Sequence, residues 1–130
     1  MKLLALFSLL TFTLFSQTLS WRGDYSTAHQ EALGTHRSLL VLVVKRDDER
    51  THRILREVFM DQPYIDKLKK RVVSVMVTYE GSTSYPIEMF YTTEFPALFL
   101  VDEKELFLHK PLYGDDISKE NLEKIVIELP

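Results

Sequence analysis

The sequence predicts an α/β domain with a central mixed β-sheet flanked by helices on both faces. Two unbroken apolar runs, at 39–44 and 97–101, and a largely apolar stretch rich in β-branched residues at 72–79 are typical of buried strands. Apolar residues at helical spacing lie between 39–44 and 72–79, which indicates a crossover connection. Only a short turn separates the run at 97–101 from the apolar stretch at 106–110, so these two strands must be antiparallel.

The first half of the domain is expected to contain three helical segments. A helix within 21–37 has Asp24 as a suitable N-cap, and Gly34 is expected to end or weaken it. Helical spacing resumes after a charged loop, with a helix at 52–60 and a further helical turn or two at 64–68.

The second half is expected to end in a strand pair and a helix. A short helix at 86–91 is predicted, with Pro86 in its first turn. Pro96 stands at the mouth of the apolar run at 97–101, where proline is tolerated because it has no amide hydrogen to give to a sheet. Gly114 is expected to end the return strand, and Ser118 to start the last helix.

Residues 1–20 are predicted to be a signal peptide that precedes a single domain at 21–130. A positive start leads into an apolar stretch of about 13 residues, and Thr18 and Ser20 give the small-x-small pattern for cleavage before Trp21. The stretch is shorter than the roughly 20 residues of a membrane span, although an uncleaved anchor is the alternative. We expect an exported protein, periplasmic or secreted, without a stable membrane span after cleavage.

The composition excludes several classes of function. The chain has 130 residues, a net charge of −3 and no cysteine. It contains no basic run, so a nucleic-acid-binding surface is not expected. The four glycines do not cluster and no Ser-His-Asp order is present. No catalytic residue and no cofactor are predicted, and the domain must be held together by packing alone.

These segments together resemble the thioredoxin-like family over nearly all of 21–130, in particular its small exported members. The opening helix leads into the first buried strand, and a loop then runs into a helix with LREVF at 55–59. The segment FPALFL at 95–100 resembles the family's cis-proline strand. LYG at 112–114 precedes the last helix, as the family's glycine does. The resemblance implies the thioredoxin-like fold and a cis Phe95–Pro96 peptide bond.

The chain departs from the family at the position that carries its chemistry. The family has a Cys-x-x-Cys pair between the first buried strand and the next helix, and the spacing places Asp48, Glu49, Arg50 and Thr51 there. Thiol–disulfide exchange requires a thiolate and a second sulfur atom, and threonine cannot replace either. Redox catalysis of the family type is therefore excluded, and the protein is not expected to be an enzyme.

The acidic residues of this loop have three possible roles. Asp47, Asp48 and Glu49 precede a helix, where exposed amides and the helix dipole stabilise negative charge. Together with His52 they are also candidates for a small zinc or manganese site, although their spacing matches no closed metal site. A charged patch that binds a partner is the third possibility. The other histidines are expected to be half-buried or at the surface.

The resemblance also implies a groove for a partner. In the family, the residue before the cis-proline presents its backbone to an extended peptide, and this requires no cysteine. The corresponding groove here would consist of Glu94, Phe95, Pro96, Arg50 and Thr51. Three further aromatic residues precede Phe95 closely: Tyr85, Phe90 and Tyr91. These three residues either pack in the core beneath the loop or form an exposed patch that binds a polypeptide.

The sequence thus predicts a redox-inactive, exported thioredoxin-like domain that binds a protein or peptide partner through the cis-proline groove. One alternative is a metal-binding protein or non-redox enzyme that uses the loop at 47–52. Another is a structural subunit of an exported complex that makes its contacts through the helix at 118–129.

Overall fold

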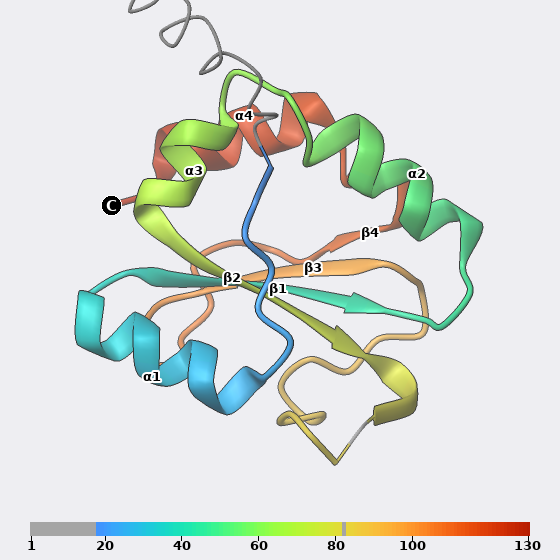
Figure 1. Ribbon diagram of the computed structural model, residues 1–130, viewed down its shortest axis with the longest axis horizontal. Helices are drawn as coiled ribbons and strands as arrows, with labels where there is room; N and C mark the ends of the chain where they lie inside the picture. The colour runs from blue at the N-terminus through green and yellow to red at the C-terminus, as the bar shows by residue number, and fades with distance from the viewer. Residues whose placement is uncertain (1–17, 82) are drawn as a thin grey trace, which may run out of the picture.

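The computed structural model describes residues 18–81 and 83–130, which form a four-stranded mixed sheet between two layers of helices (Figure 1). The strand order is β2-β1-β3-β4. β1 is parallel to β2 and antiparallel to β3, and β3 is antiparallel to β4. The predicted fold class is confirmed. The strand bounds are Ser38–Val44 (β1), Val72–Thr78 (β2), Ala97–Val101 (β3) and Leu112–Tyr113 (β4).

Helix α1 covers one face of the sheet, and α2, α3 and α4 cover the other (Figure 1). α2 begins three residues before the expected position 52, because the charged residues of the preceding loop already form its first turn. Ser118 is the N-cap of α4, as predicted, and its Oγ accepts a hydrogen bond from the N–H of Asn121 at 3.2 Å. The helices are α1 (Tyr25–Thr35), α2 (Glu49–Val58), α3 (Ile65–Arg71) and α4 (Lys119–Glu128), with short 3₁₀ turns η2 (Tyr79–Gly81) and η3 (Gly114–Asp116).

Two cores, one on each face of the sheet, explain why the apolar run of β1 is unbroken. Successive side chains of a strand point to opposite faces. Leu40 and Leu42 of β1 lie in the core under α2, α3 and α4. Leu39, Val41 and Val43 lie in the core on the side of α1. Every residue of β1 is buried, so each position of the run must be apolar or small.

Helix α1 begins where the sequence predicts and ends later. The carboxylate of Asp24 accepts a hydrogen bond from the N–H of Thr27 at 2.9 Å, which caps the helix. The predicted stop at Gly34 is wrong, because the helix continues to Thr35. The left-handed residue that ends it is His36, with φ 54°, and the backbone N–H of His36 donates to Ala32.

The short helix predicted at 86–91 is wrong, because this segment consists of turns. The carbonyl of Pro86 accepts a hydrogen bond from the N–H of Phe90 at 3.3 Å, but the turn does not continue into a helix. Phe90 is fully buried, and its ring centroid lies 5.5 Å from that of Tyr25 and 5.2 Å from that of Phe99. Packing of this aromatic side chain under α1 therefore decides the path of the segment.

The return strand predicted at 106–110 is also wrong. After β3 the chain makes a single bridge between Val101 and Phe107, and the strand that pairs with β3 is β4, further along the chain. Asp102 accepts a hydrogen bond from the N–H of Leu106 at 2.9 Å, and this turn interrupts a regular hairpin. β4 pairs with β3 in the antiparallel direction that was predicted for the return strand, and the single bridge to Phe107 is antiparallel as well.

Residues 18–22, which we call the N-terminal strap, run across the molecule toward α1 (Figure 1). Thr18 forms an isolated bridge with Met60, and Arg22 forms one with Val75 at the edge of β2. The N–H of Arg22 donates to the carbonyl of Ser74 at 2.8 Å. The strap therefore occupies part of the sheet edge that β2 would otherwise expose.

The strap also contributes to the core. Leu19 is only 4% exposed and belongs to the core under α2, α3 and α4. The ring of Trp21 meets that of Phe59 edge to face, with the centroids 5.3 Å apart. Residues 1–17 of the predicted signal peptide lie outside the described residues, and cleavage before Trp21 stays a prediction. No helix in the described ranges is long and apolar enough to cross a membrane.

An ion-pair network joins the strap to α1 and to the turn before β1. Glu31 of α1 accepts a hydrogen bond from Arg22 Nε at 3.0 Å and from Arg37 Nη2 at 2.7 Å. The hydrogen bond from Arg22, followed by the charges of Arg22 and Arg37, lowers the pKa of the Glu31 carboxyl. Glu31 therefore stabilises the fold as a carboxylate.

A chain that begins at Thr18 is expected to be more stable than one that begins at Trp21. The difference should be about 2–4 kcal/mol, because the shorter chain lacks the buried Leu19 and leaves a cavity. Urea unfolding measures it. Leu19→Ala in the longer chain should reproduce most of the loss, whereas Leu33→Ala, at a site that is 45% exposed, should cost far less. Equal unfolding midpoints of the two chains would show that residues 18–20 do not contribute to the stability of the fold.

Glu31→Gln is expected to lower the free energy of unfolding at pH 7 by about 1 kcal/mol, because two arginines lose a charged acceptor. The pKa of Glu31 lies below 4.5 in the folded protein, so its contribution is complete above pH 4.5 and is lost as the pH falls through the lowered value. The variant should therefore lose less stability than the natural protein on acidification below pH 4.5. Glu88→Gln, at an exposed site, is the control and should leave the pH profile unchanged.

Candidate functional site

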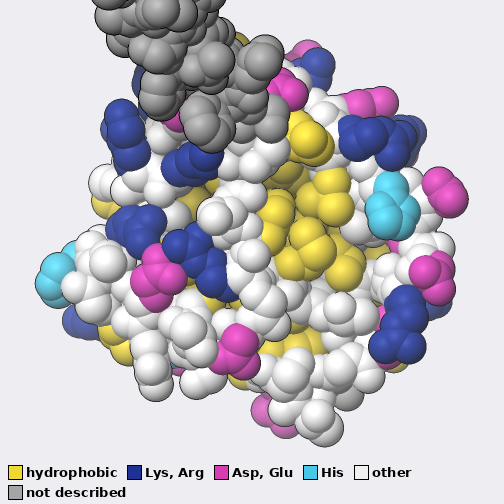
Figure 2. All heavy atoms as spheres, in the orientation of Figure 1, with side chains coloured by type: hydrophobic (Ala, Val, Ile, Leu, Met, Phe, Trp, Pro, Cys, Tyr) yellow, Lys and Arg dark blue, Asp and Glu magenta, His cyan; other side chains and the backbone are white. Residues whose placement is uncertain are grey.

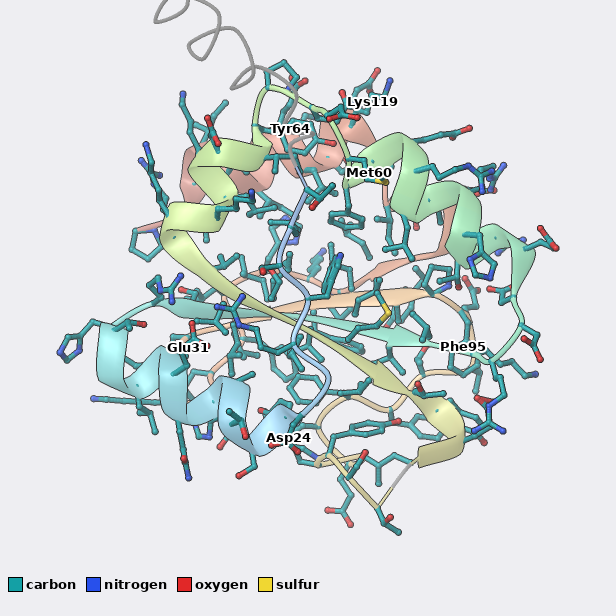
Figure 3. The ribbon with its side chains drawn as sticks, viewed as in Figure 1. Asp24, Glu31, Met60, Tyr64, Phe95 and Lys119 are labelled. Carbon is teal, nitrogen blue, oxygen red and sulfur yellow. The ribbon has the colours of Figure 1, made fainter. Side chains whose placement is uncertain are left out.

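The predicted site residues come from two segments that the sheet brings to the same end of the molecule. β1 and β3 are antiparallel, and Val43 near the end of β1 pairs with Ala97 at the start of β3. The loop after β1 and the first turn of α2 therefore lie beside the segment that ends in Phe95 and Pro96. Figure 3 shows Phe95 at this end of the sheet, next to the loop that leads into α2.

The positions that the family resemblance assigns to the two cysteines are joined by a hydrogen bond. Thr51 is 5% exposed, and its Oγ1 donates to the carboxylate of Asp48 at 2.9 Å. Asp48 is the N-cap residue of α2, but its side chain caps no backbone N–H. Asp48 was predicted to accept hydrogen bonds from the amides of the helix, and its carboxylate accepts one from the hydroxyl group of Thr51 instead.

The four candidate metal ligands are not gathered around a common point. Within the described residues, no three His, Cys, Asp or Glu side chains lie close enough together to hold a metal ion. Asp47 is in the left-handed region with φ 58°, and the carboxylate of Asp48 accepts a hydrogen bond from Thr51. This arrangement gives no support to the alternative prediction of a cation site made of Asp47, Asp48, Glu49 and His52.

The segment before β3 holds Phe95 in a fixed position at the surface. The Phe95–Pro96 peptide bond is cis. The ring of Phe95 is partly buried and packs edge to face on Tyr79, with the centroids 5.2 Å apart. Lys45 Nζ lies 5.9 Å from the centre of the Phe95 ring, within the range of a cation–π contact. Pro96 itself is buried and anchors this segment to the interior of the domain.

The backbone on either side of Phe95 is hydrogen-bonded, and that of Phe95 is not. Thr92 Oγ1 donates to the carbonyl of Glu94 at 2.6 Å and accepts from the N–H of Glu94 at 3.1 Å. The carbonyl of Pro96 accepts from the N–H of Gly114 at 2.8 Å. The N–H and C=O of Phe95 take part in no hydrogen bond within the described part of the chain. They are left available to an external donor and acceptor.

A hollow of about 220 Å³ adjoins this segment. Of the aromatic residues that precede Phe95, Tyr85 and Phe90 are buried in the core, whereas Tyr91 is 64% exposed. The expectation of an aromatic surface patch thus holds for Tyr91 and fails for the other two, which fill the core as the alternative predicts. The hollow is lined by Tyr91, Thr92, Thr93, Glu94 and Tyr113.

On the other side of Pro96, Arg50 lies directly against Gly114. A Cβ atom at Gly114 would stand only 2.8 Å from Arg50 Nη1, and Gly114 has φ 54°. Glycine is therefore needed twice at this position, for the backbone conformation and for the approach of the guanidinium group. Arg50 is exposed, whereas Thr51 is buried. Of these two predicted groove residues, only Arg50 reaches the surface.

Three residues of the site are missing from the sequence-based prediction: Thr92, Tyr113 and Gly114. The position of Thr92 shortly before Phe95 and Pro96 could have indicated its role, since threonine hydroxyl groups often form hydrogen bonds to nearby backbone groups. Gly114 was indicated by the sequence as the end of a strand and as the glycine that precedes the last helix, but not as a residue of the site. Its contact with Arg50 joins residues 64 positions apart, and no local pattern reveals such a contact.

A separate apolar surface lies on the face shown in Figure 2, between the N-terminal strap and α2. Trp21, Leu55 and Met76 are partly buried and pack against the core under α2, α3 and α4. None of these three residues lines the hollow beside Phe95.

Comparison with known proteins identifies the fold. No family model matches the chain, and no curated protein matches it. Among solved structures, it is similar to one described as "DsbH Oxidoreductase", with 14% identity, a TM-score of 0.67, and coverage of 86% of this chain and 85% of that one. It is also similar to a thioredoxin from Thermus thermophilus, with 16% identity, a TM-score of 0.69, and coverage of 85% and 86%.

A third similar structure is Trxlp from Edwardsiella tarda EIB202, with 17% identity, a TM-score of 0.59, and coverage of 82% of this chain and 98% of that one. At these identities the similarity concerns the fold, and it agrees with the strand order and the helix layers described above. This chain has the thioredoxin-like fold and carries it without a cysteine.

Proposed function

We propose that this chain is a redox-inactive binding module that holds an extended segment of a partner protein at Phe95, beside Pro96. One observation carries the proposal: the backbone N–H and C=O of Phe95 have no partner within the described residues, although Glu94 and Pro96 on either side are hydrogen-bonded. An extended peptide that adds to a protein backbone needs such a donor and acceptor pair.

The surroundings of Phe95 support this proposal. Thr92 fixes the backbone of Glu94, and Tyr79 fixes the ring of Phe95, so little conformational freedom would be lost on binding. The hollow beside Tyr91 offers room for a side chain of the bound segment. Aromatic side chains at such positions contribute strongly to binding because they bury a large area at low entropic cost.

The residues in place of the cysteines favour binding over catalysis. Asp48 and Thr51 are hydrogen-bonded to each other, and neither can form a mixed disulfide with a substrate. The N-terminal sequence further supports a role after export, in a periplasm or outside the cell.

Phe95→Arg is expected to weaken binding of the partner at least about tenfold, because it removes an anchoring aromatic ring and places a second cation beside Lys45. The measurement is capture of partners by the tagged protein from its own compartment. It is followed by titration of a captured partner's extended segment into the ¹⁵N-labelled protein. The Phe95 amide should shift on binding and become protected from hydrogen exchange.

Ile127→Arg is the control, since Ile127 lies on α4 and is 81% exposed. This variant should retain the partner. Loss of the partner in the Ile127 variant but not in the Phe95 variant would contradict the proposal and support a structural subunit that docks through α4. A partner that binds without changing the Phe95 amide would contradict it as well.

A further inference from the structure

We propose that the segment bound at Phe95 carries an acidic side chain, and that Arg50 is the residue that recognises it. This inference rests on the proposed function and names the chemistry of its partner. It concerns the side of the site formed by the first turn of α2, where the positive charge of Arg50 is held beside the peptide-binding backbone.

The position of Arg50 is set by the fold. Its guanidinium group lies over Gly114, where any Cβ atom would meet Arg50 Nη1 at 2.8 Å. The N–H of Gly114 donates to the carbonyl of Pro96 at 2.8 Å. Arg50 is thus connected, through Gly114 and one backbone hydrogen bond, to Pro96, the residue that follows Phe95.

Within residues 18–81 and 83–130, Arg50 forms no salt bridge with an acidic side chain. Arg53, on the same helix, is paired with Asp115 at 2.6 Å. The carboxylate of Asp48, two residues before Arg50, accepts a hydrogen bond from Thr51. An incoming carboxylate would therefore meet a guanidinium group that no side chain within the described ranges already neutralises.

The charge around Arg50 favours an anionic ligand. An open hollow of about 510 Å³ lies along α2 beside Arg50, and its lining has more guanidinium groups than carboxylates. One of the two carboxylates, that of Asp115, is already paired with Arg53. A planar guanidinium group can bind a carboxylate through two parallel hydrogen bonds, which gives both affinity and orientation. The hollow is lined by Glu49, Arg50, Arg53, Arg56 and Asp115.

The probes that test this are short peptides of alternating valine and threonine, acetylated and amidated at their ends. One set carries a single glutamate at each position in turn, and the matched set carries glutamine. Each peptide is titrated into the ¹⁵N-labelled protein while the Phe95 amide is followed. The best glutamate peptide is expected to bind about tenfold more tightly than its glutamine counterpart, and to lose most of this advantage at high salt.

Arg50→Gln should reduce the ratio of the two affinities to about one, because the glutamate peptide loses the guanidinium group that distinguishes it from the glutamine peptide. Lys70→Gln is the matched control, because it removes one exposed positive charge on α3, away from the site. This control should leave the ratio at about tenfold. A ratio that falls equally in both variants would overturn the assignment to Arg50, because it would reflect the net charge of the protein alone.

The two proposals fail in different ways. If both peptide sets shift the Phe95 amide with equal affinity, the acidic preference is overturned and the peptide-binding function stands. If no peptide of either set shifts that amide, the proposed function fails and this inference fails with it. A glutamine peptide with a free C-terminal carboxylate that binds as tightly as the glutamate peptide would overturn the assignment to an acidic side chain.

Discussion

The structure depends on the burial of β1 between two strands and two cores. All seven residues of Ser38–Val44 are buried, and the strand pairs with β2 on one side and with β3 on the other. Both pairings bury backbone groups that must be hydrogen-bonded, and both faces bury apolar area that stabilises the fold. The antiparallel pairing with β3 also brings the start of α2 next to Phe95. The site is a direct result of the topology around this strand.

The sequence was a good guide wherever one local pattern determined the structure. Strand β1 follows from an apolar run that can fit only between two cores, and α1 and α4 from N-cap residues before apolar residues at helical spacing. It was a poor guide between β2 and β3 and after β3. There Phe90 and Asp102 determine the path of the chain, through tertiary packing and through a side-chain hydrogen bond to the backbone. Neither interaction produces a repeating pattern of apolar residues from which it could be predicted.

For the candidate site, the sequence pointed to residues that the structure brings to one end of the sheet, but it did not indicate their burial or their contacts. Phe95, Pro96 and Arg50 were identified through the resemblance, and the structure brings them together through Gly114. Thr51 and Pro96 prove to be buried supports, and the acids of the loop do not gather around a metal site. Which backbone groups are left without a partner depends on the hydroxyl of Thr92. That detail emerges only when all three-dimensional neighbours are known.

The hydrogen bond between Thr51 and Asp48 has a consequence for where such a domain can work. In a protein that holds a reactive pair of sulfur atoms at these positions, the local structure exists in two forms, and the surroundings decide which one prevails. The hydrogen bond between Thr51 and Asp48 contains no sulfur atom that could be oxidised or reduced. The conformation of the first turn of α2 therefore does not depend on the thiols and oxidants in its surroundings. The surface beside it is therefore the same on both sides of a membrane that separates a reducing from an oxidising space.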